Sequence, residues 1–456
     1  MAHELRGPFT FGEPSVDGAV VSLPYSLGSG LELVERVELP GTLSDSDAAR
    51  AALRVLHLVA GVSYYKLVAP TPLVVPAGLS AAERELVERL YDDGLREFAY
   101  RNGIDVPLAV ELVGADGGPV TDPDVARADP SGIAASGSGA LVPIGGGKDS
   151  ALVAALVPDG QLFAVNPVGA HVHLAEALGR PLASARRTLD PLLRELNAEG
   201  APNGHVPVTA ITSAISVLAA LVLGRHDVLM GIERSADEPS LVTAEGTPVN
   251  HQFSKSLEAE LLLRDAFAPT GIRYLSLLRP LTELAIGAGV ARRGLAADIV
   301  SCNRVFTVWN ENTSSREQRP CGECAKCLFT ALMVAPSSTP AAIEAQYGRA
   351  LLDESAHIEP TRDLWSAEKP FDCVGERLET AAAVVLLDRT EGWRDHAVVA
   401  ALAPEAEALL AAAGVEPGSF LSIESVQGLP VEYREVVAGL ADDLAAVPGL
   451  HPVVAP

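Results

Sequence analysis

The sequence of 456 residues is poor in basic side chains and has no long, purely apolar run. Its 34 lysines and arginines are outnumbered by 59 aspartates and glutamates, which gives a net charge of −25. This balance argues against nucleic-acid binding, which needs basic patches. The longest apolar stretch, residues 206–224, contains Thr and Ser and is expected to form a buried helix, so we expect no membrane association. Acidic residues and the lack of an apolar core at the N-terminus argue against a signal peptide.

Cysteine is also scarce, with five residues in the chain, four of them between positions 302 and 327. An odd number clustered in this way favours metal binding in a reducing compartment over disulfides, so we expect a cytoplasmic protein. Hydrophobic residues, by contrast, make up 48% of the chain. That share is enough for a sizeable core, and the length suggests two or three domains.

The pattern along the chain divides it into three predicted domains, residues 1–134, 135–339 and 340–456. The first is expected to be α+β and the last to be mixed, and the Gly- and Ser-rich stretch 129–139 is expected to be a linker. In the middle domain, strand-like segments alternate with helical ones, which indicates a doubly wound parallel α/β sheet. The strands are expected at 140–144, 161–167, 227–232 and 272–278; the segment 181–200 is expected to begin as a loop and end as a helix.

A glycine turn follows the first of these strands, in "LVPIGGGKDSALVAAL" (141–156). Glycines let the backbone approach a ligand closely, and the start of the next helix offers unpaired N–H groups, so the turn is suited to phosphate. It is not a Walker A loop, because Val142 and Asp149 stand where that pattern needs Gly and Ser/Thr. The alternative is an ordinary strand–helix turn. The predicted phosphate-binding residues are Gly145, Gly146, Gly147, Lys148, Asp149 and Ser150.

The clustered cysteines have the spacing C-x18-C-x2-C-x2-C, at Cys302, Cys321, Cys324 and Cys327. Four thiolates can complete a tetrahedral Zn²⁺ shell, and a closed shell indicates a structural ion. An iron–sulfur cluster and four unrelated buried thiols are the alternatives. Cys373 lies apart from this group.

Other polar residues lie where a site is expected. Glu233, Arg234 and Ser235 follow the strand 227–232, whose carboxyl end should open into the ligand crevice, although a solvated loop is the alternative. His251 and Lys255 begin a predicted helix and are either anion ligands or a surface cap.

Two further candidates for acid–base chemistry come from different segments. His205 precedes an apolar helix and is either a catalyst or a capping residue. Cys373 lies in "KPFDCVGE" (369–376), where apolar and charged residues mix as expected of a segment that folds over a site. Lys255, His251, His205 and Cys373 are the predicted catalytic residues.

These motifs resemble those of known families. The turn resembles the PP-loop of the N-type ATP pyrophosphatases, S-G-G-x-D-S, with Gly145 in place of the first Ser. The cysteine arrangement is similar to that of the 7-cyano-7-deazaguanine synthases, which also carry a PP-loop. Taken together, "HLVAGVSYYKL", "NGHVPVTAI", "GIERSA", "VNHQFSKSLE", "SCNRVF", "CGECAKCLF" and "KPFDCVGE" resemble the UDP-N-acetyl-α-D-muramoyl-L-alanyl-L-glutamate epimerases across nearly the whole chain.

The resemblance implies a PP-loop (HUP-type) domain with a zinc-binding segment. It also implies an enzyme of peptidoglycan precursor synthesis that takes ATP and a UDP-muramoyl dipeptide and inverts the terminal L-Glu to D-Glu, releasing AMP and diphosphate. ATP, Mg²⁺ and a structural Zn²⁺ are the expected cofactors. The alternatives are an amide- or nitrile-forming synthetase related to the deazaguanine synthases, and a nucleotide sensor without turnover. The identity of the base, the number of bases and the oligomeric state stay open.

Overall fold

The computed structural model describes residues 7–28, 30–121, 138–305 and 319–448. The predicted linker 129–139 lies outside the described residues, apart from its last two positions. The chain divides into two compact units. Unit 1 comprises residues 1–141, 183–228 and 242–275, and unit 2 comprises residues 142–182, 229–241 and 276–456. The three-domain division expected from the sequence stays a prediction.

Unit 1 contains a mixed sheet in the order β6-β5-β1-β3-β4-β9, with β2 paired to β3. Strands β3 and β4 alternate buried and exposed residues, as a sheet with one covered face requires. The pairs β1–β3, β3–β4 and β4–β9 are antiparallel, whereas β1–β5 and β5–β6 are parallel. The strands are β1 (Phe9–Phe11), β2 (Ser15–Asp17), β3 (Val20–Ser26), β4 (Glu32–Glu38), β5 (Leu73–Val74), β6 (Leu112–Val113) and β9 (Leu182–Thr188).

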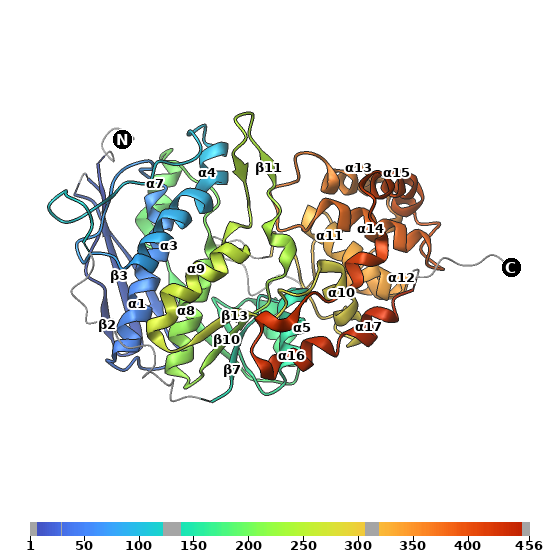
Figure 1. The fold of residues 1–456 in the computed structure, drawn as a ribbon, viewed down its shortest axis with the longest axis horizontal. Coiled ribbons are helices and arrows are strands. Elements are labelled where there is room, and N and C mark those ends of the chain that lie inside the picture. Colours follow the sequence, from blue (N-terminus) through green and yellow to red (C-terminus); the bar gives the residue numbers. More distant parts are fainter. Residues whose placement is uncertain (1–6, 29, 122–137, 306–318, 449–456) are drawn as a thin grey trace. The chain divides into compact units, whose positions relative to one another are not determined.

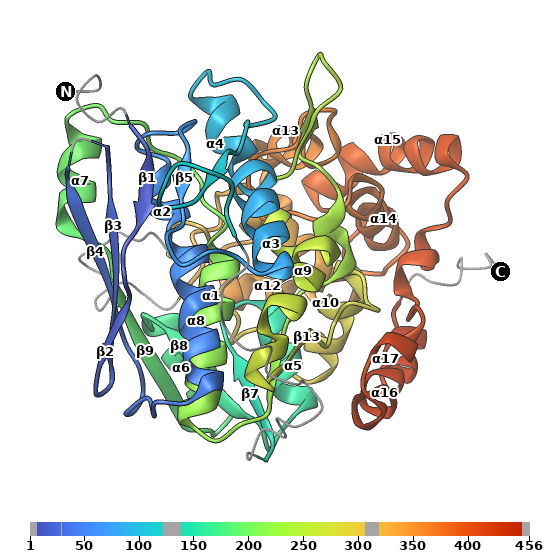
Figure 2. The ribbon, with the colours of Figure 1, turned by 60° about the vertical axis from the view of Figure 1, so that its left-hand side comes forward.

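Helices cover this sheet. In unit 1, α1, α3, α8 and α9 pack against one another, and Figure 2 shows α1 and α8 along one face of the blue strands. Ser46 caps α1 and Ser80 caps α3, so both begin at the residue types that favour helix starts. The helices are α1 (Asp47–Ala60), α2 (Val62–Tyr65), α3 (Ala81–Asp92), α4 (Arg96–Arg101), α7 (Pro191–Ala198), α8 (Val208–Val222) and α9 (Leu257–Phe267).

A buried ion pair joins β4, β9 and α2 inside unit 1. The Arg187 guanidinium donates to both carboxylate oxygens of Glu35, at 2.7 and 2.9 Å, and to the Ser63 hydroxyl at 2.8 Å. The Glu35 side chain is completely buried. The pair is bidentate and its charges are shielded from water. The loss of one partner would therefore leave the other charge buried without a partner.

Three strands begin in unit 1 and end in unit 2: β7 (Ala140–Pro143), β10 (Asp227–Met230) and β13 (Arg273–Ser276). Their order is β13-β10-β7, and β10 and β7 run parallel. In unit 2, Ile144 N donates to Phe163 O at 2.8 Å, next to the end of β7 and within β8 (Gln161–Val165). The parallel arrangement expected for the middle domain is therefore confirmed for β7 and β10. The loop expected at the start of 181–200 is wrong, because Leu182–Thr188 forms β9, which pairs antiparallel with β4.

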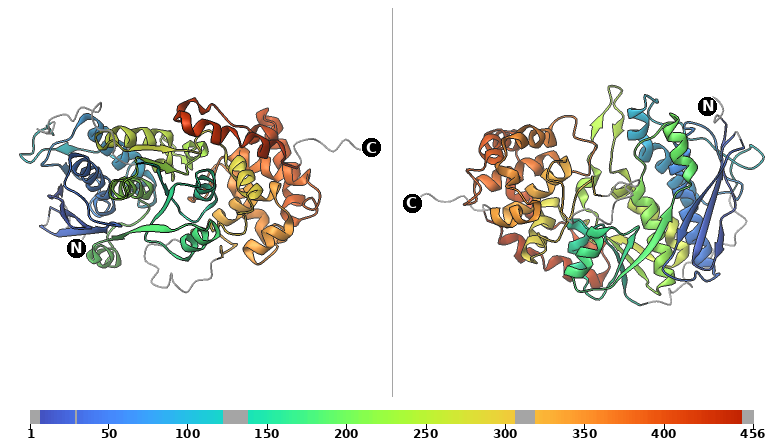
Figure 3. Two further views of the ribbon diagram at one scale, coloured as in Figure 1. Left: turned by 90° about the horizontal axis from the view of Figure 1, so that it is seen from below. Right: turned by 180° about the vertical axis from the view of Figure 1, so that it is seen from behind.

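The remainder of unit 2 is mainly helical. Figure 1 labels these helices except α6, which Figure 2 labels, and Figure 3 shows, in orange and red, those of residues 325–413 grouped together. The described part of the predicted C-terminal domain consists of helices and short 3-10 turns. The helices of unit 2 are α5 (Lys148–Leu156), α6 (Gly169–Ala177), α10 (Glu283–Arg292), α11 (Ala325–Val334), α12 (Pro340–Tyr347), α13 (Ile358–Arg362), α14 (Arg377–Asp388), α15 (Ala397–Ala413), α16 (Val431–Ala438) and α17 (Ala441–Ala445).

The apolar stretch 206–224 forms α8, and ten of its residues are buried, as expected of a core helix. Within the described residues, no single helix is long and apolar enough to cross a membrane; the bent pair Ala397–Ala413 and Pro417–Gly428 passes that test by length and composition alone.

The buried pair gives a test of the fold. Glu35→Ala leaves Arg187 buried without its carboxylate, so we expect unfolding free energy to fall by about 3–5 kcal/mol in chemical denaturation. Glu32→Ala, on an exposed position of the same strand, is the control and should cost no more than about 0.5 kcal/mol. Equal losses in the two variants would show that the pair contributes nothing specific.

Candidate functional site

The glycine turn lies between β7 and α5 in unit 2, as the sequence predicts. Gly146 has a φ of +74°, a conformation that side-chain-bearing residues rarely adopt. Its carbonyl accepts from Val300 N at 2.7 Å. A Cβ on Gly147 would lie 2.8 Å from Ser301 Oγ. The turn is therefore held against residues 300–301, and glycine is favoured at 146 by its backbone conformation and at 147 by the contact with Ser301.

Two serine hydroxyls accept hydrogen bonds from backbone amides of this turn. Gly145 N donates to Ser150 Oγ at 3.0 Å, and Lys148 N donates to Ser301 Oγ at 3.3 Å. Amides at a strand–helix turn and at a helix start are suited to bind an anion. Ser150, predicted from the sequence as a phosphate ligand, thus contacts the turn itself, whereas Ser301 was not predicted.

A buried charged cluster lies at the start of α5. The Lys148 side chain is 3% exposed, contacts the Glu283 carboxylate and lies 2.5 Å from Asp149 Oδ1. Asp149, Glu233 and Glu283 each place an oxygen within 4.8 Å of the others. Burial favours the neutral form of Lys148, but Asp149, Glu283 and Glu233 raise its pKa above the ordinary value. Burial, with Glu233 and Asp149, raises the pKa of Glu283 despite the opposing effect of Lys148.

The ends of two parallel strands position these carboxylates. Glu233 follows β10, and a Cβ on Gly231 would lie 2.9 Å from the carbonyl carbon of Asp149. Ser235 Oγ donates to Glu233 Oε1 at 3.1 Å. Glu283 is the first residue of α10, whose capping residue Thr282 accepts from Ala285 N. Glu233 therefore lies beside Asp149 of the glycine turn, and its predicted role in cofactor binding stays a prediction.

Arg234 has a different environment. Its guanidinium contacts Glu424, and its Nε lies 4.0 Å from Glu376. These carboxylates balance the charge of Arg234, so its predicted role in nucleotide binding would require it to exchange partners.

The segment "KPFDCVGE" folds against the loop after β10. Lys369 Nζ donates to Glu238 at 2.6 Å, and Arg377 donates to the other oxygen of Glu238 at 2.8 Å. A Cβ on Gly375 would lie 2.9 Å from Glu283 Cγ and 3.1 Å from Ser235 Oγ. The segment thus packs against the charged cluster, and the expectation that it folds over a site stays a prediction.

Cys373, in the same segment, is partly buried. Its neighbour Asp372 accepts from Asn303, the residue after Cys302. Cys373 thus belongs to unit 2, together with the glycine turn and the cysteine cluster. Its predicted catalytic role stays a prediction.

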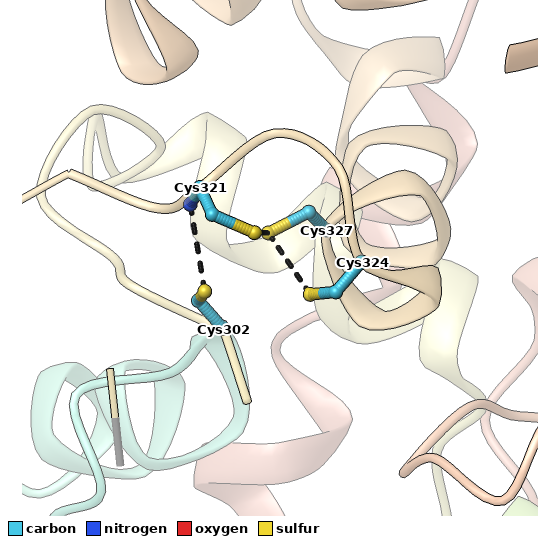
Figure 4. Close-up of side chains that lie close together, drawn as sticks. All are labelled: Cys302, Cys321, Cys324 and Cys327. Atoms are coloured by element: carbon cyan, nitrogen blue, oxygen red, sulfur yellow. Dashed lines mark hydrogen bonds between the residues drawn. The ribbon is translucent and has the colours of Figure 1, made fainter. Parts of the chain in front are cut away.

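The four clustered cysteines converge, as Figure 4 shows. The Sγ atoms of Cys321 and Cys324 lie 3.8 and 3.5 Å from that of Cys327, and Cys321 N lies 3.4 Å from Cys302 Sγ. All four Sγ atoms lie within 4.8 Å of one another. Disulfides are excluded, since they need about 2.05 Å. A tetrahedral ion with Zn–S bonds of about 2.3 Å requires sulfurs about 3.8 Å apart, so this donor set fits zinc.

The remaining catalytic candidates belong to unit 1. His251 Nδ1 lies 2.5 Å from Glu97 Oε2, and His205 Nδ1 lies 4.0 Å from the same oxygen. The two imidazole centroids are 4.2 Å apart. Lys255 ends the short 3-10 helix η3 (Phe253–Lys255) that follows His251. The structure thus brings His205 and His251 together around Glu97.

Comparison with known proteins decides the family. The family model described as the MurL N-terminal domain matches residues 3–277, and the one described as the MurL C-terminal domain matches residues 298–416. A protein of Salinispora tropica named UDP-N-acetyl-alpha-D-muramoyl-L-alanyl-L-glutamate epimerase is 39% identical over 91% of each chain. The chain belongs to this epimerase family.

Two further relatives carry the same name. One, from Micromonospora sp., is 40% identical over 78% of this chain and 80% of its own length. The other, from Xanthomonas oryzae pv. oryzae, is 36% identical over 92% of this chain and 93% of its own length. The resemblance inferred from the sequence motifs is confirmed.

Sequence reasoning missed two carboxylates of these clusters. Glu283 follows a strand end and a Thr cap, a pattern that could have placed it beside Glu233. Glu97 lies inside a helical pattern, where an acidic residue normally faces solvent, and nothing local distinguishes it. Its burial depends on segments more than 100 residues away.

The buried carboxyl of Glu379 predicts a stability that depends on pH. Burial raises the pKa of Glu379 from 4.5 to about 8, although Leu284 N donates to it at 2.7 Å and opposes the shift. The folded chain therefore keeps a proton on Glu379 at pH values where the unfolded chain has lost it. The stabilising effect of this proton is complete below pH 4.5 and is lost as the pH rises toward 8.

We therefore expect Glu379→Gln to raise the free energy of unfolding at pH 8 by an amount on the order of a few kcal/mol, and to have little effect near pH 5. Thermal and chemical unfolding at both values measure this. Glu391→Gln, at an exposed position after α14, is the control. A Glu379→Gln effect that is the same at both pH values would contradict the assignment.

Proposed function

We propose that this chain is an ATP-dependent epimerase that inverts the terminal L-Glu of UDP-N-acetylmuramoyl-L-Ala-L-Glu to D-Glu through an acyl-adenylate. The observation that carries the proposal is a glycine turn beside a buried lysine and three carboxylates, in a chain of the epimerase family. The names of the relatives support this choice of substrate. The glycine turn and the three carboxylates support the binding of ATP.

The chemistry requires activation. The α-carbon of a carboxylate is a very weak acid, because its deprotonation places charge beside an existing anion. In the proposed reaction, a carboxylate oxygen of the glutamate attacks the α-phosphorus of ATP, and the bond to the β,γ-diphosphate breaks. The resulting acyl phosphate is neutral at the carbonyl, which can accept enolate charge. Proton removal and return from the other face invert the centre, and water then releases AMP and the free acid.

The residues at the turn fit the first step. The backbone amides of the turn and of the start of α5 would donate to phosphate. Two of them, Gly145 N and Lys148 N, would have to exchange the hydroxyls of Ser150 and Ser301 for phosphate oxygens. Lys148 adds a cation that its three neighbouring carboxylates keep protonated. Asp149, Glu233 and Glu283 would hold Mg²⁺, which prefers oxygen ligands and neutralises phosphate charge.

The cysteine cluster is proposed to hold one structural Zn²⁺, because a shell of four thiolates leaves no position open for chemistry. Its place in unit 2 suggests what the ion stabilises. Cys302 directly follows Ser301, whose hydroxyl accepts from Lys148 N. Cys327 Sγ lies 3.7 Å from Ser301 O. The cluster would thus fix the wall against which the glycine turn packs.

Cys373, Lys255, His251 and His205 are the proposed acid–base groups. The alternative activity, amide or nitrile formation, would also release diphosphate but would consume ammonia and produce no D-Glu. A match to the MurL family models over both 3–277 and 298–416 favours the epimerase.

The activation step has a direct test. With ATP, Mg²⁺ and UDP-N-acetylmuramoyl-L-Ala-L-Glu, the chain should release diphosphate and form D-Glu. Asp149→Asn removes one carboxylate of the cluster, and Gly146→Val forces a branched residue into a left-handed conformation. Both variants should lower the rate of diphosphate release roughly a hundredfold or more.

Asp159→Asn, an exposed aspartate just beyond α5, is the matched control and should keep the wild-type rate. Circular dichroism would verify that each variant is folded. Normal turnover by folded Asp149→Asn would exclude the proposed site. Diphosphate release without D-Glu would point to the synthetase.

The zinc proposal is tested by metal analysis. Purified chain should contain about one Zn per molecule. Cys324→Ser should lose the metal and melt several degrees lower, because metal binding contributes to folding. Cys373→Ser, the matched control outside the cluster, should keep both the zinc and the melting temperature. An iron chromophore, or metal-free wild-type protein of full stability, would overturn the assignment.

A further inference from the structure

Three of the five lysines are almost completely buried, and one of them differs from the other two in its surroundings. Lys148 and Lys369 each contact carboxylates. Lys66, in unit 1, is 7% exposed, and its only side-chain partner in the described part of the chain is the amide oxygen of Asn203, at 2.5 Å. Since lysine is rarely buried unless an opposite charge is paired with it, the environment of Lys66 is incomplete.

The backbone that carries Lys66 is fixed in the interior of unit 1. Tyr64 and Tyr65, which directly precede it, are completely buried. The Tyr64 hydroxyl accepts from Asp190 N at 3.0 Å. The Tyr65 hydroxyl donates to Thr71 O at 3.1 Å. The side chain of Lys66 therefore starts from a buried and well-anchored backbone.

The residue at the other end of the contact is exposed. Asn203 lies at the surface, in the loop before α8, and its side-chain oxygen also accepts from Gly204 N at 3.0 Å. Asn102, at the end of α4, donates to Asn203 O at 3.0 Å. A Cβ on Gly204 would lie 3.2 Å from the Phe98 ring. The loop is thus held on α4, and the buried ammonium reaches a surface residue whose position is fixed.

The ammonium of Lys66 has no compensating charge. Burial and, to a smaller extent, the Arg187 guanidinium lower the pKa of Lys66 from 10.5 to about 8, so most molecules are still protonated at neutral pH. Arg187 is itself paired with Glu35. Within the described residues, no carboxylate pairs with Lys66, and two of its three N–H groups have no partner.

We infer that Lys66 and Asn203 form a binding site in unit 1 for one anionic oxygen group, a phosphate or a carboxylate, of a small molecule. The ammonium supplies the charge and two N–H donors. Asn203 Oδ1 holds the ammonium in place, because it accepts from both Lys66 and Gly204 N. The NH₂ group of Asn203, which has no partner among the described residues, supplies a further donor. The bound anion provides the opposite charge that Lys66 lacks.

Other ionisable groups of unit 1 surround this site, and their titration must be separated from that of Lys66. They are His57 on α1, Tyr64 and Tyr65 on α2, Glu35 on β4, Arg187 on β9, Asp190 before α7, and His205 with Glu97.

Lysine labelled with ¹³C at Cε reports on Lys66 directly, because the full-length chain gives five signals and Lys66→Met identifies one of them. The signals are titrated with pH in the absence of ATP, alone and with inorganic phosphate, UDP or L-Ala-L-Glu, and with uridine as the uncharged control. A bound anion favours the ammonium, so it should raise the pKa of Lys66 from about 8 to about 9 or higher. A response to UDP identifies phosphate as the ligand group, and a response to L-Ala-L-Glu identifies carboxylate.

Calorimetric titration measures the affinity for the same anions. At pH 7, Lys66→Met should weaken binding roughly tenfold or more, because it removes a charged donor. The affinity of the wild-type chain should fall as the pH rises above 8, where Lys66 loses its charge. Arg50→Met, which removes an exposed positive charge from α1, is the matched control and should bind as wild type does.

A second variant keeps the inference testable if Lys66→Met fails to fold. Asn203→Asp places a carboxylate beside Lys66 at an exposed position. It should raise the pKa of Lys66 without any added anion and should weaken anion binding, because the new carboxylate takes the place of the ligand.

The inference is overturned if none of the three anions raises the pKa of Lys66, or if folded Lys66→Met or Asn203→Asp binds them with wild-type affinity. The choice of UDP and L-Ala-L-Glu rests on the proposed function, whose substrate carries both groups, whereas phosphate tests the site by itself. Failure of the proposed function looks different, since the wild-type chain would then form no D-Glu with ATP, whatever Lys66 binds.

Discussion

The charge on Lys148 is the constraint around which the candidate nucleotide site is organised. An ammonium that is 3% exposed is very costly unless opposite charges surround it. Asp149, Glu233 and Glu283 meet this need, and they come from the start of α5, the end of β10 and the start of α10. Holding one cation thus fixes three separate segments of unit 2. With three carboxylates and one ammonium, the cluster keeps an excess of negative charge, which a divalent cation would balance.

Two glycines allow segments to pack closely around this charged cluster. Gly231 brings the end of β10 against the start of α5, and Gly375 brings a distant segment against Glu283 and Ser235. Glu238 anchors that segment through Lys369 and Arg377. Since the segment also carries Cys373, a partly buried thiol is held in the unit that contains the glycine turn. Whether that thiol reacts depends on its protonation state, because the thiolate is the reactive form.

Much of this could be predicted from the sequence. The strand–glycine–helix order at 140–156 and the convergence of four cysteines follow from local patterns. Strand β9 was missed, because "PLASARRT" has few apolar residues; it is a strand because it pairs with β4 and because Arg187 meets the buried Glu35. Glu97 was missed for a similar reason. Its burial comes from the segments that carry His205 and His251, and single-sequence patterns contain no information about such distant contacts.

The proposed chemistry requires that activation be coupled to proton transfer. An acyl phosphate is open to attack by water, so activation is useful only if proton transfer follows before hydrolysis. The carboxylates around Lys148 suit the activation step, since with a divalent cation bound they would help to neutralise the charge of the phosphates.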